Sequence, residues 1–161
     1  MKSNSFKEGS EAEQEFIALR GDNIIRRSTK KEDIQEHWDV LDKEFGKIDV
    51  KAAKRKYRNG QVDGTIWWEL TTVKRPPHWK STDGWGVPNG IDRYVAVKTH
   101  DYFYLVKPEK VIDKIREKCK DYYRGEWGLH SRPTRGDLIT ILPLSFLQEH
   151  SDHKLKIGEA A

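Results

Sequence analysis

The chain has 161 residues, of which 35% are hydrophobic and 35% are charged, and it carries a formal net charge of +4. This length suits one domain with a small core, and no apolar run is long enough to cross a membrane. The single cysteine, Cys119, excludes an intramolecular disulfide framework and a zinc site built from several thiolates. Because no apolar segment follows Met1, we expect no secretory leader and a cytoplasmic location, in the host cytoplasm if the protein is viral.

Apolar spacing near the N-terminus predicts the first two elements. Ser10 and Glu13 match a capping box, and the apolar residues around them at helical spacing predict a helix over residues 10–20. Ile24 and Ile25 predict a short strand that runs into a polar loop.

Alternating residues and turn signals then predict an antiparallel meander over residues 38–73. Its strands are expected at residues 37–41, 47–52 and 65–73. A long irregular loop is expected from Pro76 to Gly90, because prolines and glycines are frequent there.

The second half of the chain has further strand and helix signals. We expect strands at residues 92–98, 102–106 and 137–142, a helix that begins near Pro108, and a short helix that ends near His150. No linker divides the chain, so residues 1–161 are expected to form a single domain, with residues 1–8 as a flexible leader and residues 154–161 as a flexible tail.

Two clusters of basic residues lie in the first third of the chain. They consist of Arg26, Arg27, Lys30 and Lys31, and of Lys47, Lys51, Lys54, Arg55, Lys56 and Arg58. Clusters of this density favour contact with the phosphate backbone of a nucleic acid, although a solvated surface explains each of them equally well.

Three charged residues indicate a chemical site. Asp49 and Lys51 are two apart on a predicted strand, so their side chains project from the same face. The hairpin before them would bring Asp39 beside Asp49. Two carboxylates and an ammonium that meet in a buried place are costly, and a divalent cation such as Mg²⁺ or Mn²⁺ would remove that cost.

Such a site would suit phosphodiester hydrolysis. A cation held by Asp39 and Asp49 polarises a phosphate and acidifies water. Lys51 would orient the water or neutralise charge on the phosphate, Glu13 would complete the metal shell, and Arg27 would contact a phosphate with two nitrogens. An exposed strand with ordinary salt bridges is the alternative that the spacing alone leaves open.

The order of these residues resembles the PD-(D/E)XK nuclease superfamily, and residues 7–56 resemble archaeal-type Holliday junction resolvases. The residues that carry this resemblance are Gly9 to Glu13 at the start of the first helix, Ile24 to Ser28 at a strand that ends in Arg-Ser, Lys30 and Lys31 before Asp39, and the tripeptide Asp49-Val50-Lys51.

This resemblance implies an α/β fold with a restriction-endonuclease-like core, in which a mixed central β-sheet is flanked by helices. It implies Mg²⁺ ligands, with Mn²⁺ as a substitute, at Glu13, Asp39, Asp49 and the Val50 carbonyl. It also implies Lys51 as the catalytic lysine and Arg27 and Ser28 at the phosphate. The resolvases are homodimers that place two nicks across a four-way DNA junction, and two-fold symmetry suits that branched substrate.

The chain also departs from these resolvases. The loop between Arg27 and Asp39 is longer, and a Trp-rich strand follows Lys56. A PD-(D/E)XK nuclease for flaps, ends or duplex therefore stays open, as does a DNA-binding module without catalysis.

Other residues have a chemical and a structural interpretation. Glu69 is an additional site acid or, as we favour, a structural residue. For His37 we favour a structural role over metal binding or proton transfer. The tryptophans are expected in the core or a dimer interface rather than stacked on bases, and Cys119 is expected in the core.

Overall fold

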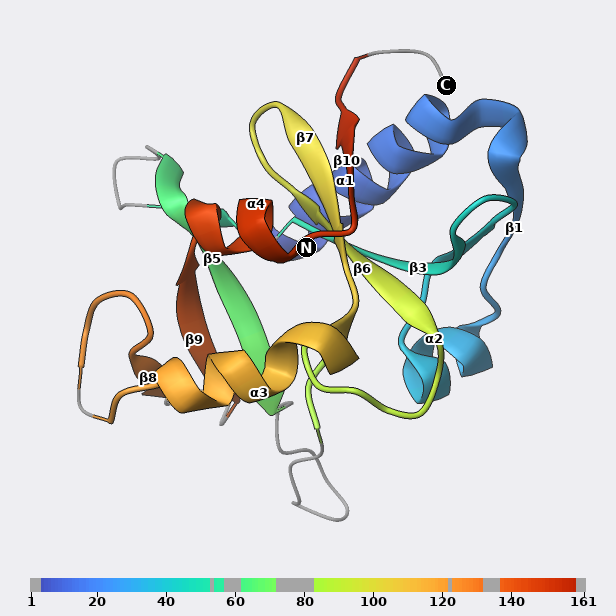
Figure 1. Cartoon of the computed structure of the whole chain (residues 1–161). Helices are drawn as coiled ribbons and strands as arrows, with labels where there is room; N and C mark the ends of the chain where they lie inside the picture. The colour runs from blue at the N-terminus through green and yellow to red at the C-terminus, as the bar shows by residue number, and fades with distance from the viewer. Residues whose placement is uncertain are drawn as a thin grey trace. The chain divides into compact units, whose positions relative to one another are not determined.

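The computed structural model describes residues 4–52, 54–56, 62–71, 83–121, 123–131 and 137–158, with side chains from Gly9 onward except in 54–56 and 62–64. The chain forms two compact units, each made of separate stretches (Figure 1). The first unit comprises residues 1–52, 90–107 and 151–161, and the second comprises residues 53–89 and 108–150.

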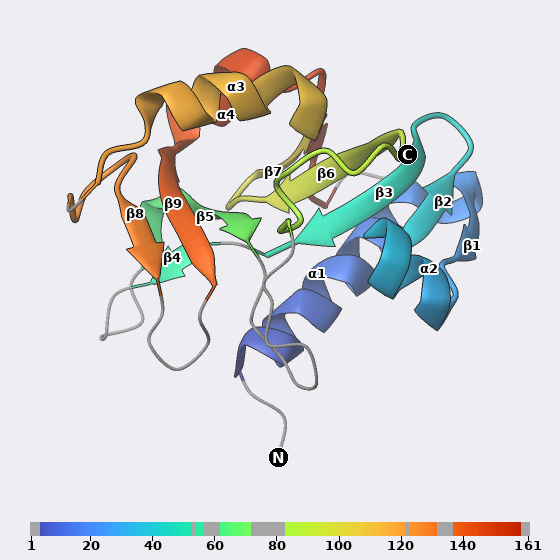
Figure 2. The same cartoon turned by 90° about the horizontal axis from the view of Figure 1, so that it is seen from below.

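The first unit is built on a six-stranded mixed sheet. Its strands, in spatial order, are β1 (Ile24–Arg27), β2 (Val40–Asp42), β3 (Gly46–Lys51), β6 (Arg93–Lys98), β7 (Tyr102–Val106) and β10 (His153–Lys156). β3 and β6 run parallel, and the other neighbouring pairs are antiparallel (Figure 2).

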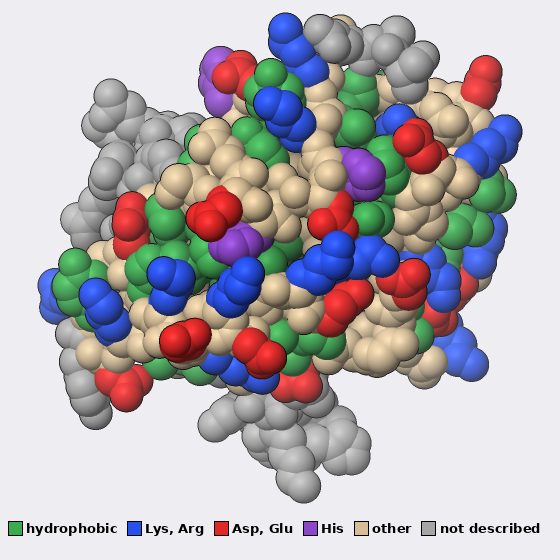
Figure 3. All heavy atoms as spheres, viewed as in Figure 1, with side chains coloured by type: hydrophobic (Ala, Val, Ile, Leu, Met, Phe, Trp, Pro, Cys, Tyr) green, Lys and Arg blue, Asp and Glu red, His purple; other side chains and the backbone are tan. Residues whose placement is uncertain are grey.

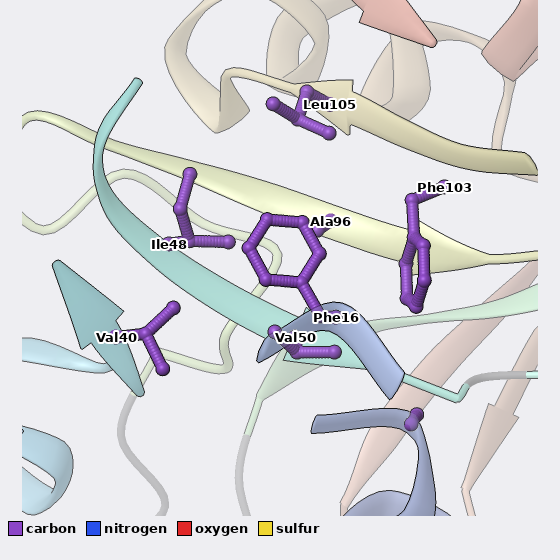
Figure 4. Packing of buried hydrophobic residues seen from close by; sticks show 8 residues of the cluster. Phe16, Val40, Ile48, Val50, Ala96, Phe103 and Leu105 are labelled. Carbon is purple, nitrogen blue, oxygen red and sulfur yellow. The ribbon is translucent and has the colours of Figure 1, made fainter. Parts of the chain in front are cut away.

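Helix α1 (Asn4–Arg20) packs against this sheet, and the short α2 (Lys30–Glu36) leads into β2 after a 3-10 turn, η1 (Gly21–Asn23), and β1. Phe16 of α1 meets Phe103 edge to face, with ring centroids 5.2 Å apart. The core around this pair contains Ala12, Val40, Ile48, Val50, Ala96 and Leu105 (Figure 4). Because side chains alternate along a strand, burial of Ile48 and Val50 against α1 directs Asp49 and Lys51 to the other face of β3.

The second unit has an antiparallel sheet and two helices. The strands, in spatial order, are β4 (Lys54–Lys56), β5 (Val62–Thr71), β9 (Leu138–Pro143) and β8 (Leu129–Ser131), and the helices are α3 (Pro108–Lys118) and α4 (Leu144–His150). Trp68 of β5 is fully buried and donates a hydrogen bond to the Gly86 carbonyl at 2.9 Å. Position 86 has to be glycine, because a Cβ there would collide with the Trp68 ring.

The expected α/β class with a mixed sheet and flanking helices is confirmed. The strands expected at residues 92–98 and 102–106 are confirmed as β6 and β7, and the expected helix after Pro108 is α3, whose Val111, Ile112 and Ile115 are buried. The core placement expected for the tryptophans is confirmed for Trp38, Trp68 and Trp85. Cys119 is only partly buried. Within the described ranges, no helix has both the length and the apolar composition that a membrane crossing would need.

Several predicted boundaries are wrong. The first helix begins at Asn4, so Ser10 is not its N-cap, and backbone over residues 4–8 that was expected as part of a leader is helical. Part of the expected tail, up to Lys156, is strand β10, which pairs with β7.

The strand expected at residues 37–41 begins only at Val40, because a helix occupies the expected polar loop. Thr29 caps α2: its hydroxyl accepts the Glu32 N–H at 3.2 Å, and its own N–H donates to the Glu32 carboxylate at 2.9 Å. His37 ends the helix with a left-handed backbone, at φ 58°.

The meander expected over residues 38–73 ends at β3. β3 pairs with β6 in parallel, whereas β5 belongs to the sheet of the second unit. Local turn signals cannot reveal a parallel partner that lies far along the chain.

Candidate active site

The β2–β3 hairpin brings Asp39 to the strand that carries Asp49. The Asp39 backbone is fixed on both sides: its carbonyl accepts the Ser28 N–H at 2.7 Å, and its N–H donates to the Ile48 carbonyl at 2.8 Å. Its carboxylate then accepts the Val50 N–H at 2.7 Å. Asp39 is therefore anchored to β3 at the position next to Asp49.

Asp49 is fully buried between two cations. Its Oδ1 lies 3.2 Å from Lys51 Nζ, and its Oδ2 lies 3.6 Å from Arg93 Nη1. Among the described residues, nothing donates a hydrogen bond to Asp49 Oδ2. A buried carboxylate oxygen without a donor is unusual in folded proteins and points to a missing ligand.

Desolvation is the main cause that raises the pKa of both aspartates. Desolvation, and then the nearby charge of Asp49, raise the pKa of Asp39 to about 7. Desolvation also raises the pKa of Asp49, while Lys51 and Arg93 oppose that rise. Two carboxylates at close range in a poorly hydrated place are both ionised only when additional positive charge is supplied.

Glu13 approaches this pair from α1. Its Oε1 lies 3.4 Å from Arg27 Nη1 at the end of β1, and its side chain is 26% exposed. Partial burial and the charge of Asp39 raise the pKa of Glu13, and Arg27 opposes the rise. Glu13 is therefore coupled to Asp39, and it also forms an ion pair with Arg27.

The donor set fits a hard divalent cation. The described part of the chain contains no ready-made group of three or more His, Cys, Asp or Glu side chains for a metal. It does contain the half-buried Asp39 beside the buried Asp49, one oxygen of which accepts no hydrogen bond there. Mg²⁺ binds through one or two carboxylates and keeps water or phosphate oxygens as its other ligands, so this pair is sufficient. Asp39 and Asp49 would hold the cation, together with the Val50 carbonyl that the resemblance to the resolvases implies.

The predicted DNA-binding residues differ in exposure and in the contacts that they make within the protein. Lys30 and Lys31 are exposed in the first turn of α2, and Arg27 is exposed beside Glu13. The Arg26 guanidinium instead makes hydrogen bonds of 2.7 and 2.9 Å to Glu32 and lies over the Trp38 ring, which holds α2 to β1. Ser28 is half-buried, and its N–H supports Asp39.

The second basic cluster is divided between the units: Lys47 and Lys51 belong to the first unit, and Lys54, Arg55 and Lys56 belong to the second. The backbone of Lys54, Arg55 and Lys56 forms β4, and their side chains are outside the described residues. On the face drawn in Figure 3, basic side chains are interspersed with acidic ones. The net charge therefore does not by itself identify that face as a DNA-binding surface.

The structure adds two arginines that the sequence did not predict. Arg93 is 1% exposed and faces Asp49, and its position at the start of an apolar strand gave no signal of this contact. Arg20, at the end of α1, makes hydrogen bonds to Asp42 at 2.7 Å and to Glu44 at 2.9 Å. The second arginine fixes α1 to the turn of the hairpin that carries the aspartates.

Two residues with open interpretations have structural contacts. The Glu69 carboxylate accepts the Trp85 N–H at 3.3 Å within the second unit. His37 ends α2 and is half-buried, and desolvation together with the charges of Arg93 and Lys51 lowers its pKa. The structural role favoured for each residue stays a prediction, and the charges that act on His37 place it near Arg93 and Lys51 of the candidate site.

No family model, curated protein or solved structure matches the chain. The functional inference therefore depends on the residues and geometry described above.

Proposed function

We propose that the first unit is a metal-dependent nuclease of the PD-(D/E)XK type, with a restriction-endonuclease-like core. One observation supports this most: Asp39, Asp49 and Lys51 meet at the open end of the β2–β3 hairpin, with Glu13 beside them. These residues come from a helix, from the position just before β2 and from β3, in the order that is typical of that superfamily.

Each side chain has a defined task in this proposal. When bound, Mg²⁺ supplies the Lewis acidity that polarises a phosphate and acidifies water. Asp39 and Asp49 bind the cation, and Lys51, whose side chain is 31% exposed, neutralises charge that develops on the phosphate. Arg27 is 60% exposed and would exchange Glu13 for a phosphate oxygen.

The proposed substrate is a four-way DNA junction. The support for it is the resemblance of residues 7–56 to archaeal-type Holliday junction resolvases, on which the proposed homodimer also depends. Two active sites related by two-fold symmetry would nick two strands of the junction as a pair.

A second candidate is a PD-(D/E)XK nuclease with another DNA substrate, such as a flap, an end or a duplex site. The observation that favours it is the second unit, whose four-stranded sheet begins where the resemblance to the resolvases ends. The site chemistry would be the same, and only the choice of DNA would differ.

The test is a cleavage panel with four-way junction, flap, single strand and linear duplex of matched sequence, each with Mg²⁺, Mn²⁺ or EDTA. We expect metal-dependent cleavage, fastest on the junction, and a loss of at least about 100-fold in Asp49→Asn. Asp101→Asn, which changes an exposed aspartate in the β6–β7 turn, is the matched control and should cleave like the wild type.

Three outcomes would contradict parts of the proposal. Equal rates on junction and duplex would remove the resolvase activity and leave the second candidate. Undiminished cleavage by Asp49→Asn would remove the site. DNA binding without cleavage of any substrate would favour a non-catalytic binding module.

A further inference from the structure

Arg93 is an arginine in a place where arginine is rare. It is 1% exposed, and arginine is almost never fully buried unless it is paired. Arg93 is the register partner of Lys47 on β3, so it shares a sheet face with Asp49 and Lys51. Its Nη1 lies 3.6 Å from Asp49 Oδ2. The buried charge is therefore directed at the most buried carboxylate of the candidate site.

The two cations around Asp49 differ in access to solvent. The Lys51 side chain is 31% exposed and lies on the Oδ1 side, whereas the Arg93 side chain is 1% exposed and lies on the Oδ2 side. A DNA phosphate can reach Lys51, but Arg93 is enclosed by the protein. Asp49 is the residue of the candidate site through which Arg93 can act on the reaction.

Asp49 needs this second cation for a physical reason. The Val50 N–H, which is the backbone donor next to Asp49 on β3, already donates its hydrogen bond to Asp39. Asp49 Oδ2 accepts no hydrogen bond among the described residues. Without Arg93, a buried carboxylate beside another carboxylate would have only the partly exposed Lys51 to compensate its charge.

We propose that Arg93 is a positioning residue, which holds the Asp49 carboxylate in place for a divalent cation without touching the substrate. This inference rests on the proposed function, because the cation is that of the nuclease site. It goes beyond that function by assigning a task to a residue on a strand that the sequence pattern does not connect with the site.

The first test is Mn²⁺ affinity of the full chain, measured by electron paramagnetic resonance without DNA. Arg93→Met should bind Mn²⁺ about 10- to 100-fold more weakly, as is usual when a residue that supports a metal ligand is lost. Arg93→Lys keeps the charge and should recover part of the affinity. Arg20→Met removes another buried arginine, the partner of Asp42, and should leave Mn²⁺ affinity unchanged. A folded Arg93→Met protein with wild-type Mn²⁺ affinity would overturn the inference.

The second test is a double-mutant cycle of unfolding free energy in EDTA. It compares Arg93→Met, Asp49→Asn and the double variant with the wild type. We expect Arg93→Met to cost much less stability when Asp49 is already Asn. If Arg93→Met does not fold, the double variant should still fold. Additive costs, or a double variant that also fails to fold, would show a structural role independent of Asp49 and overturn the inference.

Failure of this inference is distinguishable from failure of the proposed function. A wild type that neither cleaves DNA nor binds Mn²⁺ overturns the proposed function and, with it, the metal part of the inference. A wild type that cleaves DNA, together with an Arg93→Met variant of undiminished Mn²⁺ affinity, overturns the inference alone.

Discussion

Each end of the β2–β3 hairpin buries an aspartate near an arginine, but the two carboxylates differ in the hydrogen bonds that they accept. At the turn, Asp42 accepts hydrogen bonds from Arg20 and from the N–H groups of Glu44 and Phe45. At the open end, one oxygen of Asp49 accepts no hydrogen bond from any residue that the structure describes.

The difference separates a structural acid from a functional one. A carboxylate that stabilises a fold has its oxygens saturated by donors, as Asp42 has. A carboxylate that binds a ligand has to keep a lone pair available, and the fold bears the cost until the ligand arrives. One hairpin thus combines a stable anchor with the strained candidate binding site.

The largest effect that tests this comparison is on stability. Asp42→Asn leaves Arg20 buried with only Glu44 as a charged partner, and we expect it to lower the free energy of unfolding by about 3 kcal/mol. Asp39→Asn removes one of two repelling carboxylates and keeps an oxygen for the Val50 N–H, so it should raise metal-free stability at pH 8. Urea denaturation in EDTA measures both. If both substitutions destabilise equally, the two ends do not differ as described.

The next effect is stabilisation by metal. Mg²⁺ at about 100 times its dissociation constant should stabilise the wild type by about 2.7 kcal/mol, because it binds only the folded site. Asp39→Asn should lose most of this gain, whereas Asp42→Asn should keep it despite its lower starting stability. Denaturation curves with and without Mg²⁺ give the difference for each variant. A gain that survives in Asp39→Asn would place the cation elsewhere.

A third effect, small for each pH unit, concerns pH. Folding raises the pKa of Asp39 from an ordinary value of 3.8 to about 7, so between these values the folded protein binds more protons than the unfolded chain. The metal-free free energy of unfolding should therefore fall as pH rises from 4 to 7, by at most about 1.4 kcal/mol per pH unit from this group. Asp39→Asn should remove this slope in a series of denaturation curves in EDTA. The same slope in both proteins would assign it to other groups.

The smallest expected effect is the loss of stability when the N-terminal cap of α2, the helix before the open end of the hairpin, is removed. Thr29→Ala removes the hydroxyl that caps the helix and should lower the free energy of unfolding by about 1 kcal/mol. Thr29→Ser keeps the hydroxyl and serves as the matched control. Thermal unfolding of the two variants measures the difference, and equal midpoints would show that the cap does not hold this end of the hairpin.

The meeting of Asp39 and Asp49 could be predicted from the sequence because it depends on local geometry. A strand places Asp49 and Lys51 on one face, and a short hairpin limits where Asp39 can lie. The capping box of α2 was also visible at Thr29 and Glu32, but the two basic residues between them were interpreted as part of a loop.

Arg93 could not be predicted by the same reasoning. Its contact with Asp49 depends on the parallel pairing of β3 and β6, and no turn residue or alternation pattern specifies that register. The same long-range pairing explains why the predicted meander ended too late. Sequence patterns therefore predicted the half of the site that lies on one hairpin, and the remainder required the tertiary structure.

The parallel pairing of β3 and β6 also has a consequence for biosynthesis. β3 leaves the ribosome before its neighbour, and the segment between them belongs to the other unit. Until β6 has been translated, β3 presents an open hydrogen-bonding edge with apolar Ile48 and Val50, which is the kind of exposed strand that nascent chains aggregate through. The interval before β6 emerges is therefore the stage at which this chain would most need a chaperone.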